Sequence, residues 1–301
     1  MYYGRNESFH YAECGNCGLV YQLLPPNDLG SYYPDNYHCH QVPSKKFNPK
    51  SIVLRIRDRA VVRGKKNILS DFIDQKRPAP AILKTFSHNN PSFSDQILDI
   101  GCGSGEFLFQ LEDIGFKNLT GVDPFLPDDV HTISSNISFR KTSLFHLQGI
   151  FDIITLNHSF EHMVEPDLVL EKLNKLLSPK GRIMIRIPIA GSAAWEQYKE
   201  NWYQLDAPRH LFLYSINSLN ILAQRCGFKI TSTVFDSTIT QFTRSQLYKQ
   251  GITSIDFLNK YEGKLDKFFS EEQLRAWALE TIKVNQSETG DQAAFILTKS
   301  K

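Results

Sequence analysis

The sequence predicts an α/β fold built on a doubly wound, largely parallel sheet, and three observations support that prediction. A short apolar run at 97–100 ends in three alternate glycines, after which an amphipathic helix begins. A second strand at 119–122 follows that helix and ends in the acid Asp123. Beyond it, strand and helix patterns alternate up to residue 188, as they do in βαβ units.

The glycines at 101, 103 and 105 predict a tight turn between the first strand and its helix. Glycine lets the main chain pass close to a ligand, and the helix N-terminus beyond the turn offers unpaired N–H groups. A dinucleotide fingerprint would place its third glycine where Glu106 stands, and a carboxylate there would face a pyrophosphate. The turn therefore favours a cationic nucleotide without phosphates, such as S-adenosylmethionine, over a nicotinamide dinucleotide.

Two acids flank this turn. Asp99 precedes it, and Asp123 ends the second strand, where a carboxylate can accept hydrogen bonds from both ribose hydroxyls. The Asp-x-Gly-x-Gly-x-Gly pattern with the second acid resembles motif I of the class I S-adenosylmethionine-dependent methyltransferases. The resemblance implies a Rossmann-like, doubly wound seven-stranded sheet with an antiparallel last strand. It implies that the cofactor is held by Asp99, Gly101, Cys102, Gly103, Gly105, Asp123, Pro124 and Asn157.

The stretch from 137 to 188 continues the alternation. We expect strands at 137–143, 151–157 and 182–188, and a helix that opens at Pro166 among acidic residues. Within this stretch, the Glu-His pair at 161–162 and the Leu-Leu-Ser-Pro-Lys-Gly turn at 176–181 resemble the corresponding region of ubiquinone-type and sugar methyltransferases. Asn157 and His158 follow a buried strand at the edge where doubly wound sheets bind ligands, so both should border the methyl-transfer site.

Three histidines are candidates for a catalytic base. Methyl transfer from a sulfonium is an in-line displacement, which depends mainly on alignment. A hydroxyl or acidic carbon acceptor also needs a base with a pKa near neutrality, and histidine suits that role. We predict His162, His210 or His158 as this base, with a structural role as the alternative for each. Glu161 is the candidate to orient a neighbouring imidazole.

Aromatic residues gather between 195 and 214. Trp202 and Tyr203 precede an Asp-Ala-Pro-Arg-His stretch that resembles a segment facing the active site in the sugar-type enzymes. Aromatic faces stack on rings while polar groups bind hydroxyls. We therefore predict Trp202 and Tyr203 as substrate residues, with core packing as the alternative, and Arg209 as the partner of an anionic substrate group.

The chain beyond residue 214 completes the predicted sheet. Ser215 is a helix cap, and strands at 228–236 and 293–298 should form an antiparallel pair at the sheet edge. Residues 241–290 between them are mainly helical and polar. They predict a helical insertion that serves as a lid or as an oligomer contact.

Residues 1–50 predict a small Cys- and Tyr-rich module. Cys14 and Cys17 lie in a Cys-x-x-Cys-Gly-Leu-Val-Tyr stretch that resembles the module preceding the methyltransferase domain in many enzymes of sugar and cell-envelope biosynthesis. A tetrahedral zinc site needs four ligands. Cys14 and Cys17 supply two, and the enzymes that it resembles carry an earlier Cys-x-x-Cys pair. The module therefore predicts either two reduced thiols or a zinc site. The candidates for the two remaining zinc ligands are His10, His38, Cys39 and His40.

Residues 51–95 predict a basic helical linker before a methyltransferase domain at 96–301. Arg55, Arg59 and Arg63 recur at helical spacing. They form either a solvated face or a patch for an anionic substrate handle, such as a nucleotide-sugar diphosphate, or for a membrane surface.

Composition limits the function further. The 301 residues carry 34 Lys+Arg against 32 Asp+Glu, which gives no global reason to expect nucleic acid as a partner. No apolar run is long enough for a membrane span, and five cysteines do not form a disulfide framework, so we expect a cytoplasmic protein. The leading hypothesis is methylation of a small molecule, either a sugar or cell-envelope precursor or a quinone-like metabolite. A non-catalytic S-adenosylmethionine-binding protein is the alternative from another class.

Overall fold

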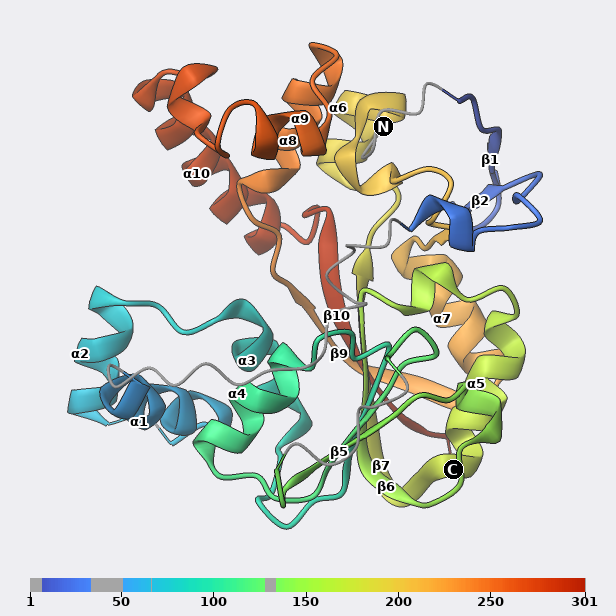
Figure 1. Ribbon diagram of the computed structural model, residues 1–301, viewed down its shortest axis with the longest axis vertical. Helices are drawn as coiled ribbons and strands as arrows, with labels where there is room; N and C mark the ends of the chain where they lie inside the picture. Colours follow the sequence, from blue (N-terminus) through green and yellow to red (C-terminus); the bar gives the residue numbers. More distant parts are fainter. Residues whose placement is uncertain (1–6, 34–50, 66, 128–133, 301) are drawn as a thin grey trace.

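The computed structural model describes residues 7–33, 51–65, 67–127 and 134–300, and its centre is a seven-stranded sheet (Figure 1). The strand order is β5-β4-β3-β6-β7-β10-β9. The first five strands in this order, β5, β4, β3, β6 and β7, pair in parallel with their neighbours. Strand β10 pairs antiparallel with both β7 and β9. The predicted doubly wound sheet with an antiparallel last strand is therefore confirmed. The strands are β3 (Ile97–Ile100), β4 (Leu119–Val122), β5 (Ile137–Arg140), β6 (Phe151–Asn157), β7 (Leu177–Pro188), β9 (Phe228–Phe235) and β10 (Gln292–Lys299).

Both faces of the sheet are covered by helices, which Figure 1 shows on its two sides. Along β3, Ile97 packs in one core cluster and Leu98 in the other, because successive strand residues point to opposite faces. One face is covered by α1 (Ser51–Val62), α3 (Ala81–Phe86) and α4 (Glu106–Ile114), and the other by α5 (Pro166–Leu176) and α7 (Ile216–Arg225). The continuous apolar character of the central strands follows from this double burial.

Strand β7 differs from its prediction at one end. The sequence predicts a turn at 178–181 and a strand from 182, but β7 already begins at Leu177. Its pairing with β6 shifts register between Phe151 and Ile153, which absorbs the extra residues. Gly181 is required there, because a Cβ would lie 2.7 Å from the Leu177 side chain.

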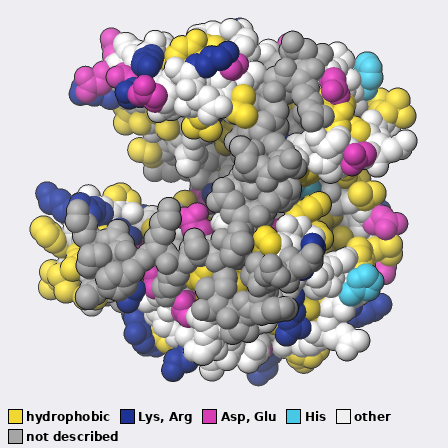
Figure 2. Space-filling model, viewed as in Figure 1, with side chains coloured by type: hydrophobic (Ala, Val, Ile, Leu, Met, Phe, Trp, Pro, Cys, Tyr) yellow, Lys and Arg dark blue, Asp and Glu magenta, His cyan; other side chains and the backbone are white. Residues whose placement is uncertain are grey.

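A helical lobe stands over one end of the sheet. It contains α6 (Ala193–Tyr198), α8 (Thr240–Lys249), α9 (Ser254–Asn259) and α10 (Glu271–Gln286), so residues 241–290 are mainly helical as expected. Figure 2 shows the surface hollowed between this lobe and the helices α1 and α2 (Ile68–Lys76). Within the described ranges, every helix is too short or too polar to serve as a membrane span.

The arginine stripe at 55, 59 and 63 contacts neighbouring parts of the protein. Arg59 and Arg63 lie over the ring of Phe93, at 4.5 and 5.3 Å from its centroid, and Arg55 forms an ion pair with Asp113. The stripe is therefore a contact with the domain as well as an exposed basic surface.

The N-terminal segment joins the rest of the protein through a second, three-stranded sheet. Its strands are β1 (Tyr11–Glu13), β2 (Val20–Gln22) and β8 (Phe212–Leu213), in that order. The turn between β1 and β2 holds Cys14 and Cys17, and the carbonyl oxygen of Cys17 accepts a hydrogen bond from Ser215, which caps α7. The division of the chain at residues 50 and 95 stays a prediction.

Candidate active site

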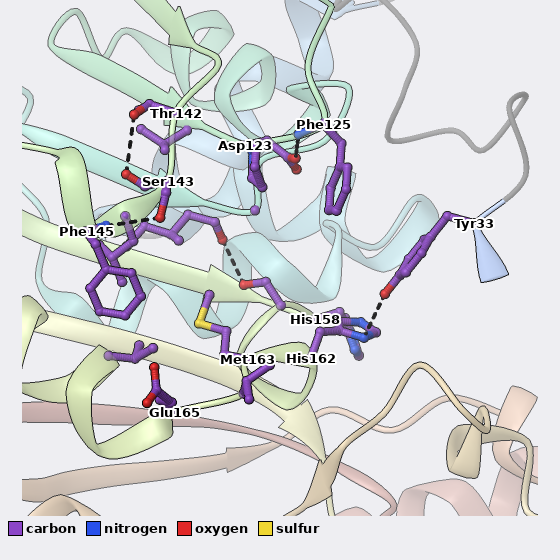
Figure 3. A pocket seen from close by; sticks show the side chains of 18 residues that line it. Tyr33, Asp123, Phe125, Thr142, Ser143, Phe145, His158, His162, Met163 and Glu165 are labelled. Atoms are coloured by element: carbon purple, nitrogen blue, oxygen red, sulfur yellow. Dashed lines mark hydrogen bonds between the residues drawn. The ribbon is translucent and has the colours of Figure 1, made fainter. Parts of the chain in front are cut away.

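A cavity of about 510 Å³ opens where β3, β4, β5 and β6 end (Figure 3). Gly101 follows β3, Asp123 follows β4, and His158 follows β6. The segments 142–145, beyond β5, and 162–165 supply further parts of the wall. The cavity thus occupies the edge at which doubly wound sheets bind their ligands. Five predicted site residues line it, and these are Gly101, Asp123, Pro124, His158 and His162.

The glycine turn is fixed by the packing of the protein itself. Gly101 has a φ of +73°, and a Cβ there would lie 2.5 Å from the Cβ of Ser159. Gly105 also has a φ of +73°, and its Cβ would meet the Phe139 ring at 2.3 Å. Real carbon contacts are far longer, so both positions require glycine. The close approach brings the main chain of the turn to the cavity wall.

The turn and the end of β4 are joined by a hydrogen bond. The amide of Gly103 donates to Oδ2 of Asp123 over 3.1 Å, and the amide of Phe125 donates to Oδ1 over 2.9 Å. These bonds hold the carboxylate of Asp123 at the cavity, where the sequence predicts a ribose partner. The two parts of the predicted cofactor site are therefore adjacent.

Asp99 lies beneath the turn rather than in the cavity wall. It is 4% exposed, is absent from the cavity lining, and accepts a hydrogen bond of 2.6 Å from the hydroxyl of Thr155. Burial raises the pKa of Asp99 to about 7, although the bond from Thr155 acts in the opposite direction. Its predicted contact with the methionine amine stays a prediction.

Glu106 is the first residue of α4, directly after the glycine turn. A carboxylate at this helix N-terminus repels phosphate, although the exposed N–H groups would otherwise attract it. The structure thus supports the argument against a dinucleotide that the glycine spacing suggested.

The far end of the cavity was missed from the sequence. Thr142, Ser143, Leu144 and Phe145 form it, and Phe145 is 47% exposed at its mouth. A short 3-10 helix, Leu144–His146, capped by the hydroxyl of Ser143, orients these side chains. The alternation of strands predicted β5, but a single-turn helix has no periodicity by which to find it.

His158 is held by an arginine. Its backbone has a φ of +51°, and its Nε2 lies 2.9 Å from Nη1 of Arg186. A guanidinium can only donate, so Nε2 accepts the bond and Nδ1 carries the proton. Nδ1 lies 3.4 Å from Oε1 of Glu161. Arg186 in turn bonds Asn157 and Asp236, which fixes the ring and leaves His158 a positioning residue.

His162 lines the cavity, and the partners of its Nδ1 are known. Its Nδ1 lies 2.8 Å from the carbonyl oxygen of Arg209 and 3.3 Å from the hydroxyl of Tyr33 (Figure 3). A carbonyl can only accept, so Nδ1 of His162 carries the proton and Nε2 has the lone pair. Tyr33 itself lines the cavity and is a residue that the sequence did not single out.

His210 packs against His162 from the protein interior. The two rings lie 4.7 Å apart, and His210 is 5% exposed. Its Nδ1 lies 2.7 Å from the carbonyl oxygen of Gln204. Burial, followed by the charge of His162, lowers the pKa of His210 to about 4. The buried Glu161 beside them behaves in the opposite sense: burial raises its pKa, but His158 and the other imidazoles lower it more, to about 2.

The three predicted substrate residues lie outside the cavity wall. Trp202 is 1% exposed and donates a hydrogen bond from Nε1 to Asp291, and Tyr203 packs in the same cluster. Arg209 pairs with Asp206 and lies 5.4 Å from the ring of Tyr33. Their roles toward a substrate stay predictions.

The Cys-x-x-Cys turn has no further metal ligand near it among the described residues. Cys14 and Cys17 are free thiols, and the one group of three ligating side chains found in the described ranges, Glu161 with His162 and His210, lies elsewhere. His38, Cys39 and His40 fall outside those ranges. Hydrogen bonds from the backbone of Cys17 and Asn16 lower the pKa of Cys14, which is typical of an exposed turn.

Comparisons with known proteins agree with this geometry. A family model described as "Methyltransferase domain" matches residues 64–233, more than half of the chain. Ubiquinone biosynthesis O-methyltransferase from Pectobacterium carotovorum is 26% identical over 34% of this chain and 47% of its own length. The tRNA U34 carboxymethyltransferase of Idiomarina loihiensis is 27% identical over 54% of this chain and 55% of its own length. The chain therefore spans about half the length of the curated relatives that it matches.

Among solved structures, one similar chain lies in the complex between the Haloferax volcanii Trm112 methyltransferase activator and the putative methyltransferase. It has a TM-score of 0.50 and 16% identity, and the match covers 81% of this chain and 94% of that chain. This likeness concerns the fold alone. With a family match over more than half of the chain and the predicted seven-stranded sheet with an antiparallel last strand, the protein belongs to the methyltransferase-domain family.

Proposed function

We propose that this protein transfers a methyl group from S-adenosylmethionine to a small molecule. The observation that carries the proposal is the continuity of one cavity from the glycine turn and Asp123 to His162. Such a cavity brings the predicted nucleotide site next to two of the candidate histidines, His158 and His162. Its volume of about 510 Å³ falls in the range of small-ligand sites, which supports a small cofactor and a small acceptor.

The residues present fit this cofactor. In this proposal the carboxylate of Asp123 binds the ribose, the main chain at Gly101 binds the methionine part, and Phe145 with Leu144 contacts the adenine; the support is that all four residues line one cavity. When bound, S-adenosylmethionine supplies a methyl group on a positively charged sulfur. No phosphate has to be accommodated, so Glu106 at the start of α4 causes no repulsion.

The acceptor then lies at the histidine end of the cavity. His162 lines that end, and its Nε2 has the lone pair because its Nδ1 donates to the carbonyl oxygen of Arg209. A neutral imidazole in this orientation can take the proton of a hydroxyl acceptor, which makes its oxygen a better nucleophile. His210 supports the ring of His162 from behind, and Arg186 keeps His158 in place.

For the acceptor we propose a sugar or cell-envelope precursor. The support is the Cys-x-x-Cys-Gly-Leu-Val-Tyr hairpin, whose sheet continues into β8 beyond His210, and Tyr33 in the cavity wall. A tyrosine ring suits the face of a sugar. Arg209, whose guanidinium lies near the ring of Tyr33, would bind an anionic or nucleotide-linked group of such a substrate.

A quinone-like acceptor is the second candidate. It is favoured by the likeness to the ubiquinone biosynthesis O-methyltransferase of Pectobacterium carotovorum. The tRNA-modifying relative raises a nucleic-acid substrate as a further outcome, although the nearly balanced charge does not favour one.

Release of S-adenosylhomocysteine tests the proposal. The purified protein is incubated with S-adenosylmethionine and a panel of nucleotide-sugars, catechol-type quinone precursors and tRNA. We expect turnover with one small-molecule class. Binding of the cofactor without turnover on any acceptor would favour the non-catalytic alternative, and no cofactor binding would contradict the proposal.

A further inference from the structure

Glu161 is a fully buried carboxylate without a hydrogen bond in the described part of the structure. Its side chain is 0% exposed, and neither Oε1 nor Oε2 has a partner. Nδ1 of His158 lies 3.4 Å from Oε1, and the imidazoles of His162 and His210 are the other neighbours that favour the ionised carboxylate. A buried carboxylate is costly without close partners, because burial removes its hydration. A cation bound between these side chains would compensate the charge of Glu161 directly.

Two imidazoles beside Glu161 share an unusual arrangement. His162 and His210 each have Nδ1 tied to a backbone carbonyl oxygen, of Arg209 at 2.8 Å and of Gln204 at 2.7 Å. Carbonyls only accept, so both Nδ1 atoms carry protons and both Nε2 atoms have lone pairs. Histidines that ligate metals are oriented in this way, with the second nitrogen bonded to a carbonyl or carboxylate.

The distances suit one ion. Nε2 of His210 lies 3.9 Å from Oε1 of Glu161, which is too long for a hydrogen bond. One ligand atom from each of Glu161, His162 and His210 lies within 4.8 Å of the others. Bonds of about 2.0–2.2 Å to a shared ion place two ligand atoms about 3–4 Å apart. We propose that Glu161, His162 and His210 bind one divalent transition-metal ion.

The donor set indicates which cations would bind. Two imidazole nitrogens and one carboxylate suit zinc, iron, manganese or cobalt, whereas calcium and magnesium prefer oxygen ligands. Asp206 adds negative charge close by, because its Oδ2 lies 3.7 Å from Nε2 of His210. Three protein ligands leave further coordination positions open. His162 lines the cavity, so an open position faces the place of the acceptor.

The catalytic consequence rests on the proposed function. A hydroxyl acceptor bound to the cation loses its proton to solvent, and its oxygen attacks the methyl carbon of S-adenosylmethionine. The carbon–sulfur bond breaks, and its electron pair stays on the sulfur of S-adenosylhomocysteine. In this form of the site, His162 acts as a ligand rather than as the base, and the cation lowers the pKa of the acceptor.

The test is metal binding by the full chain without cofactor or acceptor. The protein is stripped with a chelator and titrated with Zn²⁺ or Co²⁺ by calorimetry, and elemental analysis gives the stoichiometry. We expect one equivalent for the native chain. Glu161→Gln and His210→Gln should each weaken binding by at least about 100-fold, because even the loss of outer partners costs about 10- to 100-fold.

Two control variants locate the ion. The double variant Cys14→Ser with Cys17→Ser, and His88→Gln on the protein surface, should both keep the single site. Circular dichroism checks that Glu161→Gln is folded. Should that variant fail to fold, the absorption spectrum of Co²⁺ bound to the native chain replaces it, since thiolate ligands add a charge-transfer band that imidazole and carboxylate lack.

No stoichiometric metal in the native chain would overturn the inference, as would equal binding by Glu161→Gln and the native protein. A thiolate band that disappears with the cysteines would overturn it too, because the ion would then sit in the N-terminal turn. Cofactor binding is measured separately with S-adenosylmethionine. A chain that binds metal but no S-adenosylmethionine would refute the proposed function alone. A chain that binds S-adenosylmethionine but no metal would refute the metal site alone.

Discussion

The amide of Gly103 donates a hydrogen bond to Oδ2 of Asp123 over 3.1 Å. This bond joins the turn after β3 to the end of β4, two segments that lie far enough apart in the chain for a whole helix to separate them. It orients the carboxylate at the wall of the cavity, so Asp123 is central to the first prediction.

Replacing Asp123 by Ala should weaken S-adenosylmethionine binding by about 10- to 100-fold, because a hydrogen bond to a charged group is worth about 1.5–3 kcal/mol. Calorimetry measures the dissociation constant of S-adenosylmethionine for both proteins. Asp152→Ala is the control, since Asp152 accepts the amide of Gln96 at the opposite end of the sheet. Equal affinities for the native chain and Asp123→Ala would contradict the ribose assignment.

Phe145 should contribute to cofactor affinity without contributing to stability. It lines the cavity and is 47% exposed, so its ring is available to an adenine. Phe145→Ala should weaken binding by about 10-fold, given about 1–3 kcal/mol for stacking of a base on an aromatic ring. Ile150→Ala, at a 58% exposed residue outside the cavity, is the matched control and should leave affinity unchanged. An unchanged affinity in Phe145→Ala would place the adenine elsewhere.

Gly105→Ala should destabilise the fold more than a comparable substitution in open space. Gly105 and Gly251 have φ values of +73° and +77°, so alanine at either position costs about 1–2 kcal/mol of backbone strain. At Gly105 the new Cβ would also meet Phe139 at 2.3 Å, whereas Gly251 has no atom within 4 Å. Urea denaturation should show the larger loss of unfolding free energy for Gly105→Ala. Similar losses in both variants would refute the argument that Phe139 determines this glycine.

Asp99 should give the folded protein a characteristic pH dependence. Burial raises its pKa to about 7 from an ordinary 3.8, so between these values the folded state holds a proton that the unfolded state has lost. The free energy of unfolding therefore falls as the pH rises from about 4 to about 7, by at most about 1.4 kcal/mol per pH unit, and is level above. Asp99→Asn should flatten this slope in denaturant titrations without cofactor. The same slope in both proteins would show that Asp99 is ionised throughout.

The sheet was predictable because its signals are local. The apolar run 97–100, the glycines after it and the acid at 123 each specify a strand, a turn or a strand end, and the structure has them at those positions. The pairing of β2 with β8 was not predictable, because two-residue β8 has no pattern and its partner lies about 190 positions earlier.

The site was predictable on the side of the glycine turn and less so elsewhere. Asp123 and His158 directly follow β4 and β6, so their places follow from the fold. Tyr33 and Phe145 reach the cavity from a loop and a single helical turn, whose course depends on tertiary contacts. The hydrogen bond from Arg186 to His158 depends on the rotamers of both side chains, so the sequence pattern does not predict it.

The small sheet formed by β1, β2 and β8 has a consequence for protein engineering. Tyr11 donates a hydrogen bond of 2.8 Å to the carbonyl oxygen of His210, and β8 begins two residues later. The amino-terminal hairpin thus braces the loop that carries Arg209 and His210. A chimera intended to change the acceptor would need to exchange residues 7–33 together with residues 202–214, because neither half keeps its register without the other.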